Sequence, residues 1–328
     1  MELPEELWES ILNRLAVDGD YGDLRSPSLA CKKFLSIANR LRQTFVAAKG
    51  DVFCRDEYNA LSRALERFRN VEEIKLYRLG TKWDVNYPIL KIACSGLDLQ
   101  SLRFHWFQIC PSADTLRRLG STMNNLNVLR CTQFPSLRDT DLVHIGDALP
   151  RLEELDIRFS SWKKFEPRQV WYPELSNHTV TDAGIEAISH KLRGLSRIDI
   201  SWNERCSDLS LIALSSNCVL LSEIKCDRCN ITRRGIDWLL GHSTQLTSLR
   251  SGHYGSSTNT SLPFDDMKIS ATGLREIDIG DCDYQERLLC SIAKAGVPLE
   301  KLSLRGTLTQ LHAVTTLLRA CPTLKHLQ

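Results

Sequence analysis

An apolar pattern recurs along most of this chain of 328 residues, with apolar residues at the first, fourth and sixth positions of a short segment. The first residues of successive segments are separated by 28, 27, 26, 43, 26, 25, 28, 25 and 25 residues. A regular period of this length is the signature of a repeat solenoid, and the spacing of 43 fits one repeat with an insertion. The segments begin at Val71, Leu99, Leu126, Leu152, Leu195, Leu221, Leu246, Leu274, Leu299 and Leu324.

Helix signals lie between these segments. Apolar residues at helical spacing occur within 182–188, 208–214 and 235–239, and each stretch follows a residue whose side chain caps helices well. These capping residues are Thr181, Ser207 and Thr232. Each repeat is therefore expected to form a strand, a turn and a helix, and stacking is what buries the apolar face that a single repeat leaves open.

The repeats resemble leucine-rich repeats of the cysteine-containing type. Asn203, Cys229 and Cys282 stand three residues after a strand, where that family stacks asparagine or cysteine. The resemblance covers about residues 71–328 and implies an α/β leucine-rich-repeat solenoid, a horseshoe of parallel strands and outer helices with about ten repeats. Three further cysteines are assigned to the family's helix-end position, which precedes the next strand: Cys110, Cys218 and Cys321.

Composition narrows the class of protein. The net charge of +2 favours neither nucleic acid nor an anionic membrane as a partner. The acidic start does not resemble a secretory signal, and no window is apolar enough for a transmembrane helix. The 12 cysteines are spread along the chain and are expected to be reduced thiols. We therefore expect a cytoplasmic or nuclear protein.

Residues 1–48 do not follow the repeat. A Leu3-Pro4 start leads into an amphipathic helix, and a polar loop at 18–22 separates it from a second helix that begins near Ser26. This segment resembles the F-box motif, which opens with Leu-Pro and closes with a Leu-Val-Cys-Lys-x-Trp-like stretch, here 29–34. Ala30 replaces the usual valine and Phe34 the usual tryptophan. The alternative is a purely structural role as a helical cap for the solenoid, which an open array needs.

The resemblance implies a division of the chain and a function. Residues 1–48 would form the F-box, 49–70 a connecting and capping segment with a helix at 58–68, and 71–328 the repeats, with an insertion near 159–177. By family analogy the F-box would dock on a Skp-type adaptor, and through it on cullin, so that the chain serves as the substrate-recognition subunit of a ubiquitin ligase. The residues implied for this docking surface are Leu3, Pro4, Leu7, Ile11, Leu29, Cys31 and Phe34. The alternatives are a leucine-rich-repeat scaffold without a ligase role and a receptor that needs a small molecule.

The concave face of the solenoid is where a protein substrate is expected. Side chains of a strand alternate, so the residue between the last two apolar positions points to that face. In the first repeats this row is basic and has aromatic neighbours, which favours an acidic or phosphorylated segment as the partner. The alternative is an ordinary solvated strand face. The candidate residues, including two from other parts of the chain, are Lys75, Tyr77, Arg103, His105, Trp106, Arg130, Trp162 and Trp202.

The sequence points to no catalytic or metal site. Cys226 and Cys229 have the spacing of half a zinc site, but no second ligand pair accompanies them, and both coincide with core positions of their repeat. Motifs for nucleotide, serine-hydrolase and zinc-protease chemistry are lacking. We expect a non-catalytic subunit with no cofactor, whose contribution is positioning.

Overall fold

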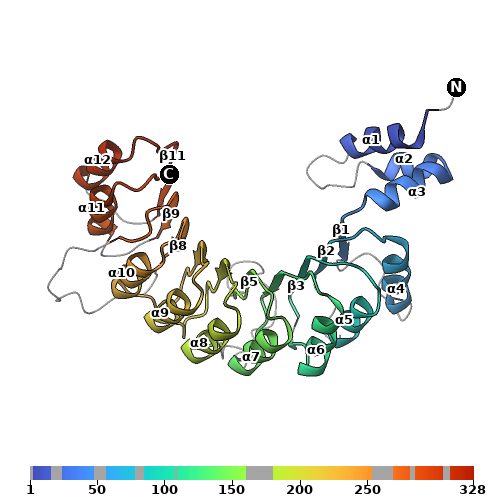
Figure 1. Ribbon diagram of the computed structural model, residues 1–328, viewed down its shortest axis with the longest axis horizontal. Coiled ribbons are helices and arrows are strands. Elements are labelled where there is room, and N and C mark those ends of the chain that lie inside the picture. The colour runs from blue at the N-terminus through green and yellow to red at the C-terminus, as the bar shows by residue number, and fades with distance from the viewer. Residues whose placement is uncertain are drawn as a thin grey trace, which may run out of the picture.

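The computed structural model describes residues 3–15, 24–47, 57–77, 85–107, 109–159, 180–252, 269–280, 285–305 and 311–328. Within these residues, the strands β1 to β11 form one open, parallel sheet in sequence order, and helices line its outer side in a horseshoe (Figure 1). The strands are β1 (Thr44–Ala47), β2 (Glu73–Tyr77), β3 (Ser101–His105), β4 (Val128–Thr132), β5 (Glu154–Asp156), β6 (Arg197–Asp199), β7 (Glu223–Lys225), β8 (Ser248–Ser251), β9 (Glu276–Ile279), β10 (Lys301–Leu304) and β11 (His326–Leu327).

The helices of the described residues fall into two groups. Helices α1 to α3 stand at one tip of the horseshoe, and α4 to α12 follow the strands along its outer side (Figure 1). The helices are α1 (Glu5–Leu15), α2 (Arg25–Ala30), α3 (Lys32–Leu41), α4 (Glu57–Arg67), α5 (Asn86–Ala93), α6 (Ala113–Thr122), α7 (Asp139–Ala148), α8 (Asp182–Lys191), α9 (Asp208–Asn217), α10 (Arg233–His242), α11 (Gln285–Ala295) and α12 (Leu311–Ala320). No helix in the described part of the chain has the length and apolarity to cross a membrane.

The predicted repeat pattern forms the core. Leu99, Leu102 and Phe104, the three apolar positions of one repeat, are fully buried. Leu102 also lies in register with Ile74 on β2 and Leu129 on β4, so equivalent residues of neighbouring repeats stack on one another. Since no repeat closes a core alone, this stacking gives a single continuous apolar core along the solenoid. The predicted leucine-rich-repeat fold is confirmed.

Hydrogen bonds join the starts of successive helices in the central repeats. The predicted capping residues lie at the helix N-caps of α8, α9 and α10. Thr181, the cap of α8, donates its backbone N–H and its hydroxyl to the carboxylate of Asp139, at the start of α7, at 2.8 and 2.7 Å. A Cβ atom at Gly184 would lie 2.2 Å from Asp139 Oδ1, so glycine is required there. Ser207 repeats the arrangement on Asp182.

The stacked polar positions are partly as predicted. Asn203 is buried, and its Nδ2 donates to the carbonyls of Ile157 and Ile200 at 3.2 and 2.8 Å. Cys229 Sγ donates to the same Ile200 carbonyl at 3.2 Å, whereas Cys282 lies outside the described residues. The helix-end assignment of Cys110 was wrong, because this cysteine follows β3 and precedes α6. Its Cys-Pro pair resembles the pair at Cys321, which does follow a helix.

The sheet begins earlier than the repeat pattern predicts. Strand β1 lies inside the 1–48 segment and pairs in parallel with β2, Phe45 opposite Ile74 and Ala47 opposite Leu76. The pattern missed β1 because Arg42 occupies the position of the first apolar residue. The expected helix near 58–68 is present as α4 and contributes to the solenoid core.

Candidate functional site

The N-terminal helices have a small core of their own. Phe34 on α3 packs against Trp8 on α1, with ring centroids 4.8 Å apart. Arg40 Nη2 bonds Glu5 Oε1 at 2.5 Å, which ties the end of α3 to the start of α1. The buried residues of this cluster are separate from those of the solenoid: Leu12, Leu24, Ile37 and Ala38. We call α1 to α3 the helical module.

The helical module exposes several large apolar side chains. Leu7, Ile11 and Leu15 follow one another at i, i+4 spacing on α1 and are 50%, 42% and 45% exposed, while Leu12 on the same helix turns inward. Leu29, at the end of α2, is 79% exposed. Exposed apolar side chains that lie along one face of a helix, as on α1, mark interaction sites.

Most of the predicted adaptor-docking residues are accessible. Phe34 is the exception, because it is half-buried against Trp8 and therefore helps to hold α1 on α3. Cys31 separates α2 from α3, and its Sγ accepts the backbone N–H of Phe34 at 3.4 Å as the cap of α3. The exposed residues of the predicted set are Leu3, Pro4, Leu7, Ile11, Leu29 and Cys31.

Short connections fix the helical module to the solenoid. Only two residues separate α3 from β1, the first strand of the sheet. Arg67, at the end of α4, donates from Nε to Asn39 Oδ1 at 3.0 Å. Asn70 Nδ2 donates to the Arg40 carbonyl at 2.9 Å. Through these bonds both the helix and the turn after it hold α3.

The predicted basic row on the concave face exists in register. Lys75 on β2 lies opposite Arg103 on β3, which lies opposite Arg130 on β4. The row continues as Asp156 on β5 and Asp199 on β6. Three cations and then two acids therefore stand side by side on adjacent strands.

Two of the three cations are neutralised within the fold. Lys75 Nζ lies 2.8 Å from Glu73 Oε2, and Arg130 Nε donates to Glu154 Oε1 at 2.6 Å. Arg103 has no carboxylate partner among the described residues, and its nearest polar contact is the Tyr77 hydroxyl, 3.5 Å from Nη1. Its Nε is buried and makes no hydrogen bond. The predicted basic patch thus reduces to one unpaired arginine.

Tyr77, which contacts this arginine, belongs to a row of aromatic rings. His105 meets Tyr77 edge-on, with ring centroids 5.4 Å apart, and stacks on Trp106 at 5.5 Å. Its Nδ1 lies 2.6 Å from the hydroxyl of Thr132 on β4. Burial lowers the pKa of His105, and the positive charges of Arg158 and Arg103 lower it further. The imidazole is therefore neutral at physiological pH and lies in a positive local field.

The remaining candidates do not join this group. Trp202 follows β6, away from Trp106 after β3, and its ring lies 3.8 Å below the guanidinium of Arg228. Trp106 and Trp202 share a left-handed backbone conformation, with φ of 66° and 69°, which is rare for bulky residues. Trp162, like nearly all of the predicted insertion at 159–177, lies outside the described residues.

A hollow of about 220 Å³ lies next to the basic row, between β4 and β7, and its charged lining is balanced. Arg158 Nε and Nη1 lie 3.4 and 3.6 Å from the carboxylates of Asp156 and Asp199. Burial and the charge of Asp199 raise the pKa of Asp156 to about 6. Sequence inspection identified these two acids but not their burial.

The concave charges of the later repeats form a closed network. Arg250 Nε on β8 bonds Asp227 at 2.5 Å and lies 3.4 Å from Asp278. Arg305, after β10, bonds Asp278 at 2.7 Å and Asp227 at 3.0 Å. Each arginine therefore contacts both aspartates, and this region offers little free charge to a ligand.

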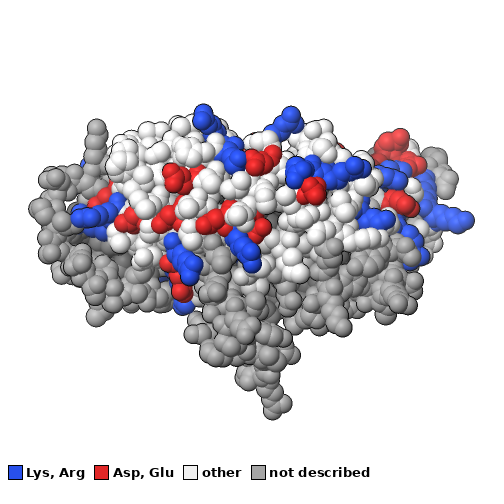
Figure 2. All heavy atoms as spheres, turned by 90° about the horizontal axis from the view of Figure 1, so that it is seen from below, with Lys and Arg blue, Asp and Glu red and all other residues white. Residues whose placement is uncertain are grey.

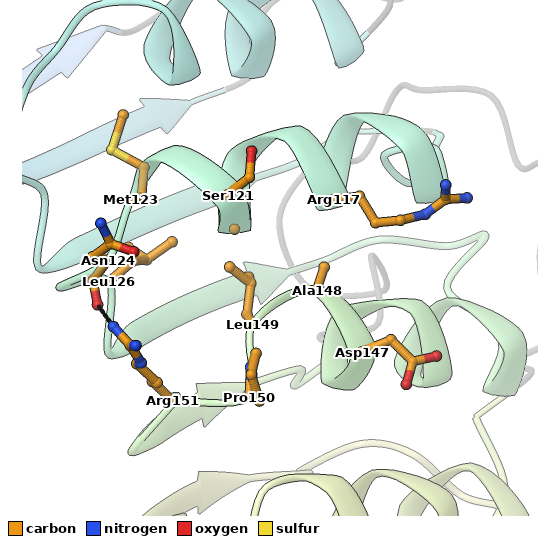
Figure 3. Close-up of a pocket in the computed structure, with 11 residues that line it drawn as sticks. Arg117, Ser121, Met123, Asn124, Leu126, Asp147, Ala148, Leu149, Pro150 and Arg151 are labelled. Atoms are coloured by element: carbon orange, nitrogen blue, oxygen red, sulfur yellow. Dashed lines mark hydrogen bonds between the residues drawn. The ribbon is translucent and has the colours of Figure 1, made fainter.

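The outer side carries a second hollow, of about 300 Å³, between α6 and the end of α7 (Figure 3). Arg117 and Asp147 lie at one end of it, and Arg151 bonds the Asn124 carbonyl at the other. Acidic and basic side chains are mixed over the described part of this outer face (Figure 2). Sequence inspection did not find this hollow, which depends on the packing of two helices.

Cys226 and Cys229 are core residues in this structure. Both are buried, and their Sγ atoms donate to the carbonyls of Arg250 and Ile200 at 3.4 and 3.2 Å. Burial raises the pKa of Cys226 to about 12 and that of Cys229 well above the ordinary value. Both thiols are therefore protonated hydrogen-bond donors within the core of their repeat.

Comparison with one solved structure, that of LegL7, supports the fold. LegL7 is a leucine-rich repeat-containing protein from Legionella pneumophila. Its structure aligns with 92% of this chain over 87% of the LegL7 chain, with a TM-score of 0.51 and 11% sequence identity. The complex of Rad7 and Elc1 in yeast matches 98% of this chain and 81% of its own, with a TM-score of 0.49 and 16% identity. No protein-family model and no curated protein sequence matches the chain.

Proposed function

We propose that this chain is the substrate-recognition subunit of a ubiquitin ligase built on a Skp-type adaptor and a cullin. The helical module binds the adaptor, and the concave face of the solenoid binds a protein substrate. The chain adds no catalytic group and contributes by holding the substrate in place. Such a subunit would act in the cytoplasm, the nucleus or both.

The observation that carries the proposal is the exposed apolar surface of the helical module. Burying one leucine side chain contributes about 1.5–3 kcal/mol of favourable free energy. A partner that covers Leu7, Ile11 and Leu29 therefore gains substantial binding free energy. The Leu3-Pro4 start and the stretch at 29–34 match the F-box resemblance, and both contribute exposed residues to the predicted docking set. A simple cap for the solenoid has no need of apolar side chains that neither its own core nor the repeats cover.

The fixed link between module and solenoid supports the same function. A receptor has to hold its substrate at a set distance from the enzyme that transfers ubiquitin. The bonds of Arg67 to Asn39 and of Asn70 to Arg40 keep α3 attached to the first repeats. A flexible linker at this point would serve a tethered scaffold better.

Adaptor binding tests the proposal. We expect the purified chain to bind a Skp-type adaptor, and the double variant Leu7→Ser/Leu29→Ser to weaken binding about a hundredfold, since exposed anchors of this kind are worth about tenfold each or more. Both side chains are exposed, so the fold should remain intact. Leu209→Ser is the matched control, because Leu209 is 61% exposed on α9. Calorimetry of a well-folded chain that shows no binding would favour the scaffold alternative.

Cysteine protection gives an independent measurement. Cys31 and Cys94 are both exposed, but only Cys31 belongs to the predicted docking surface. We expect saturating adaptor to slow the alkylation of Cys31 at least tenfold, because a docked surface excludes reagent, and to leave Cys94 unchanged. Mass spectrometry of tryptic peptides reads both rates in one sample. Equal rates at Cys31 with and without bound adaptor would place the docking surface elsewhere.

A further inference from the structure

We infer that Arg103 is the centre of an anion-binding subsite on the concave face, which binds one carboxylate or phosphate group of an extended peptide between Tyr77 and His105. The biological occupant rests on the proposed receptor function, since it would be a segment of the substrate. The chemistry of the subsite does not depend on that function.

The charge pattern is the first step. Lys75, Arg103 and Arg130 lie in register on adjacent strands, about 4.8 Å apart, and like charges directly opposite one another destabilise a sheet. Lys75 and Arg130 each have a glutamate partner. Arg103 has none in the described residues, so its charge is the one left for an external anion.

The desolvation of Arg103 is the second step. Its Nε is buried and makes no hydrogen bond, and the Tyr77 hydroxyl is a marginal acceptor at 3.5 Å. A guanidinium has five N–H donors in a planar fork that matches carboxylate and phosphate oxygens. An oxyanion would satisfy guanidinium donors, of which the fold has already removed Nε–H from water, and a hydrogen bond between charged partners is stronger than a neutral one.

The local field is the third step. Arg158, half-exposed after β5, acts on His105 together with Arg103, and both charges lower the histidine pKa. The contacts of Arg158 with Asp156 and Asp199, at 3.4 and 3.6 Å, are longer than a charged hydrogen bond. The positive potential of the two arginines is therefore incompletely neutralised between β3 and β5, which favours an anion there.

The side walls are the fourth step. Tyr77, His105 and Trp106 form a row of rings, and Tyr77 at one end of the row contacts the guanidinium. Trp106 occupies a left-handed position at which glycine is easier to accommodate, yet a large ring is present. Aromatic side chains give contact area at little loss of conformational entropy, so these rings can hold the chain of a peptide whose acidic group reaches Arg103.

Three capped pentapeptides test the inference. The probes are Gly-Gly-X-Gly-Gly with X as glutamate, phosphoserine or glutamine, titrated against full-length protein whose arginine side chains are labelled with ¹⁵N. The Nε–Hε resonances of Arg103 and Arg250 are assigned from their absence in Arg103→Gln and Arg250→Gln. Arg250 is the matched control, because it occupies the same position in its strand but contacts two aspartates.

We expect the Arg103 resonance to shift in a saturable way with the acidic peptides and to stay unchanged with the glutamine peptide. The Arg250 resonance should stay unchanged throughout. The His105 ring resonance provides a second reporter, and in Arg103→Gln the affinity it reports for the acidic peptide should fall about tenfold or more. Tighter binding of the phosphoserine peptide would identify phosphate as the group, and equal or tighter binding of the glutamate peptide would identify carboxylate.

Two results would overturn the inference. One is no saturable shift of Arg103 with either acidic peptide. The other is a shift of Arg250 with the same concentration dependence, which would mean that the peptides follow overall charge. Adaptor binding is measured separately and involves the helical module, so failure of this test would leave the proposed ligase role standing, and failure of adaptor binding would leave this subsite standing.

Discussion

An arginine in the early part of the concave face and one in the late part stand at equivalent strand positions but differ in their ion pairing. Arg103 on β3 and Arg250 on β8 occupy the same position of their strands. Arg250 bonds Asp227 on the repeat before it and contacts Asp278 on the strand after it. At the two corresponding positions around Arg103 stand Tyr77 and Arg130. The solenoid is constant, and the two neighbouring side chains decide whether an arginine is structural or available to a ligand.

Arg305 makes the later region more closed still. It reaches Asp227, 78 residues earlier in the chain, as well as Asp278. Four residues from separate repeats thereby lock together, and one of them, Asp227, is only 8% exposed. Within the described part of the chain, no such network of ion pairs surrounds Arg103 in the earlier region. The comparison predicts that variants in the later region change stability, whereas variants around Arg103 change binding.

The largest expected effect is at Asp227. Asp227→Ala removes the carboxylate that Arg250 and Arg305 share, and we expect a loss of about 2 kcal/mol in the free energy of unfolding, since both arginines remain partly solvated. Urea unfolding followed by far-UV circular dichroism measures it. Asp147→Ala, which breaks an exposed pair with Lys191, should cost less than about 0.5 kcal/mol. Equal losses in the two variants would mean that the network adds no stability.

The second prediction concerns a substitution that gives Arg103 the kind of acidic neighbour that Arg250 has. Tyr77→Asp places a carboxylate beside Arg103, at the position that Asp227 holds beside Arg250. We expect the affinity for the glutamate peptide to fall about tenfold, or about 1.4 kcal/mol, because the new carboxylate takes the place of the anion. Tyr77→Phe, which keeps the ring, should retain affinity within about threefold, since a marginal hydrogen bond is worth little. Unchanged affinity in Tyr77→Asp would argue against the subsite.

The third prediction compares the two arginines directly. Arg250→Gln should lower the free energy of unfolding by about 1 kcal/mol, because Asp227 loses one of its two charged partners. Arg103→Gln should change it by less than about 0.5 kcal/mol, because no ion pair is lost. Urea unfolding of both variants and of the unmodified protein measures the two changes in free energy. A larger loss in Arg103→Gln than in Arg250→Gln would reverse the assignment of the two regions.

The smallest effect lies at the border between the regions. Burial and the neighbouring Asp199 raise the pKa of Asp156 to about 6, above its unfolded value of about 3.9. The folded state therefore binds more protons between these values, and this group's contribution to stability falls as pH rises from about 4 to 6. Asp156→Asn should flatten that pH dependence and raise stability at pH 7 by up to about 1 kcal/mol. Lower stability of the variant at pH 7 would mean that the charged contact with Arg158 dominates.

Regular elements were predictable where the sequence repeats. The buried triplet of Leu99, Leu102 and Phe104 follows from the repeat, because the same apolar positions recur in every unit and stack on one another. The cap at Thr181 follows from local pattern, because capping depends on residues next to the helix start. Strand β1 was not predicted, because Arg42 stands where the repeat pattern requires an apolar residue. Its place in the sheet depends on pairing with β2. Cys110 was misplaced because a Cys-Pro pair does not reveal which side of a helix it occupies.

The sequence by itself determined the solenoid, the order of its strands and the row of side chains on its concave face, since a fixed period and strand alternation leave little choice. Only the tertiary structure decided which of those charges are used. Glu73 neutralises Lys75 from the same strand and Glu154 neutralises Arg130 from the next repeat, whereas Arg103 has no acidic partner among the residues that the structure describes. Ion pairing requires side chains within a few ångströms, and that distance is set by packing between repeats, which no single segment of sequence contains.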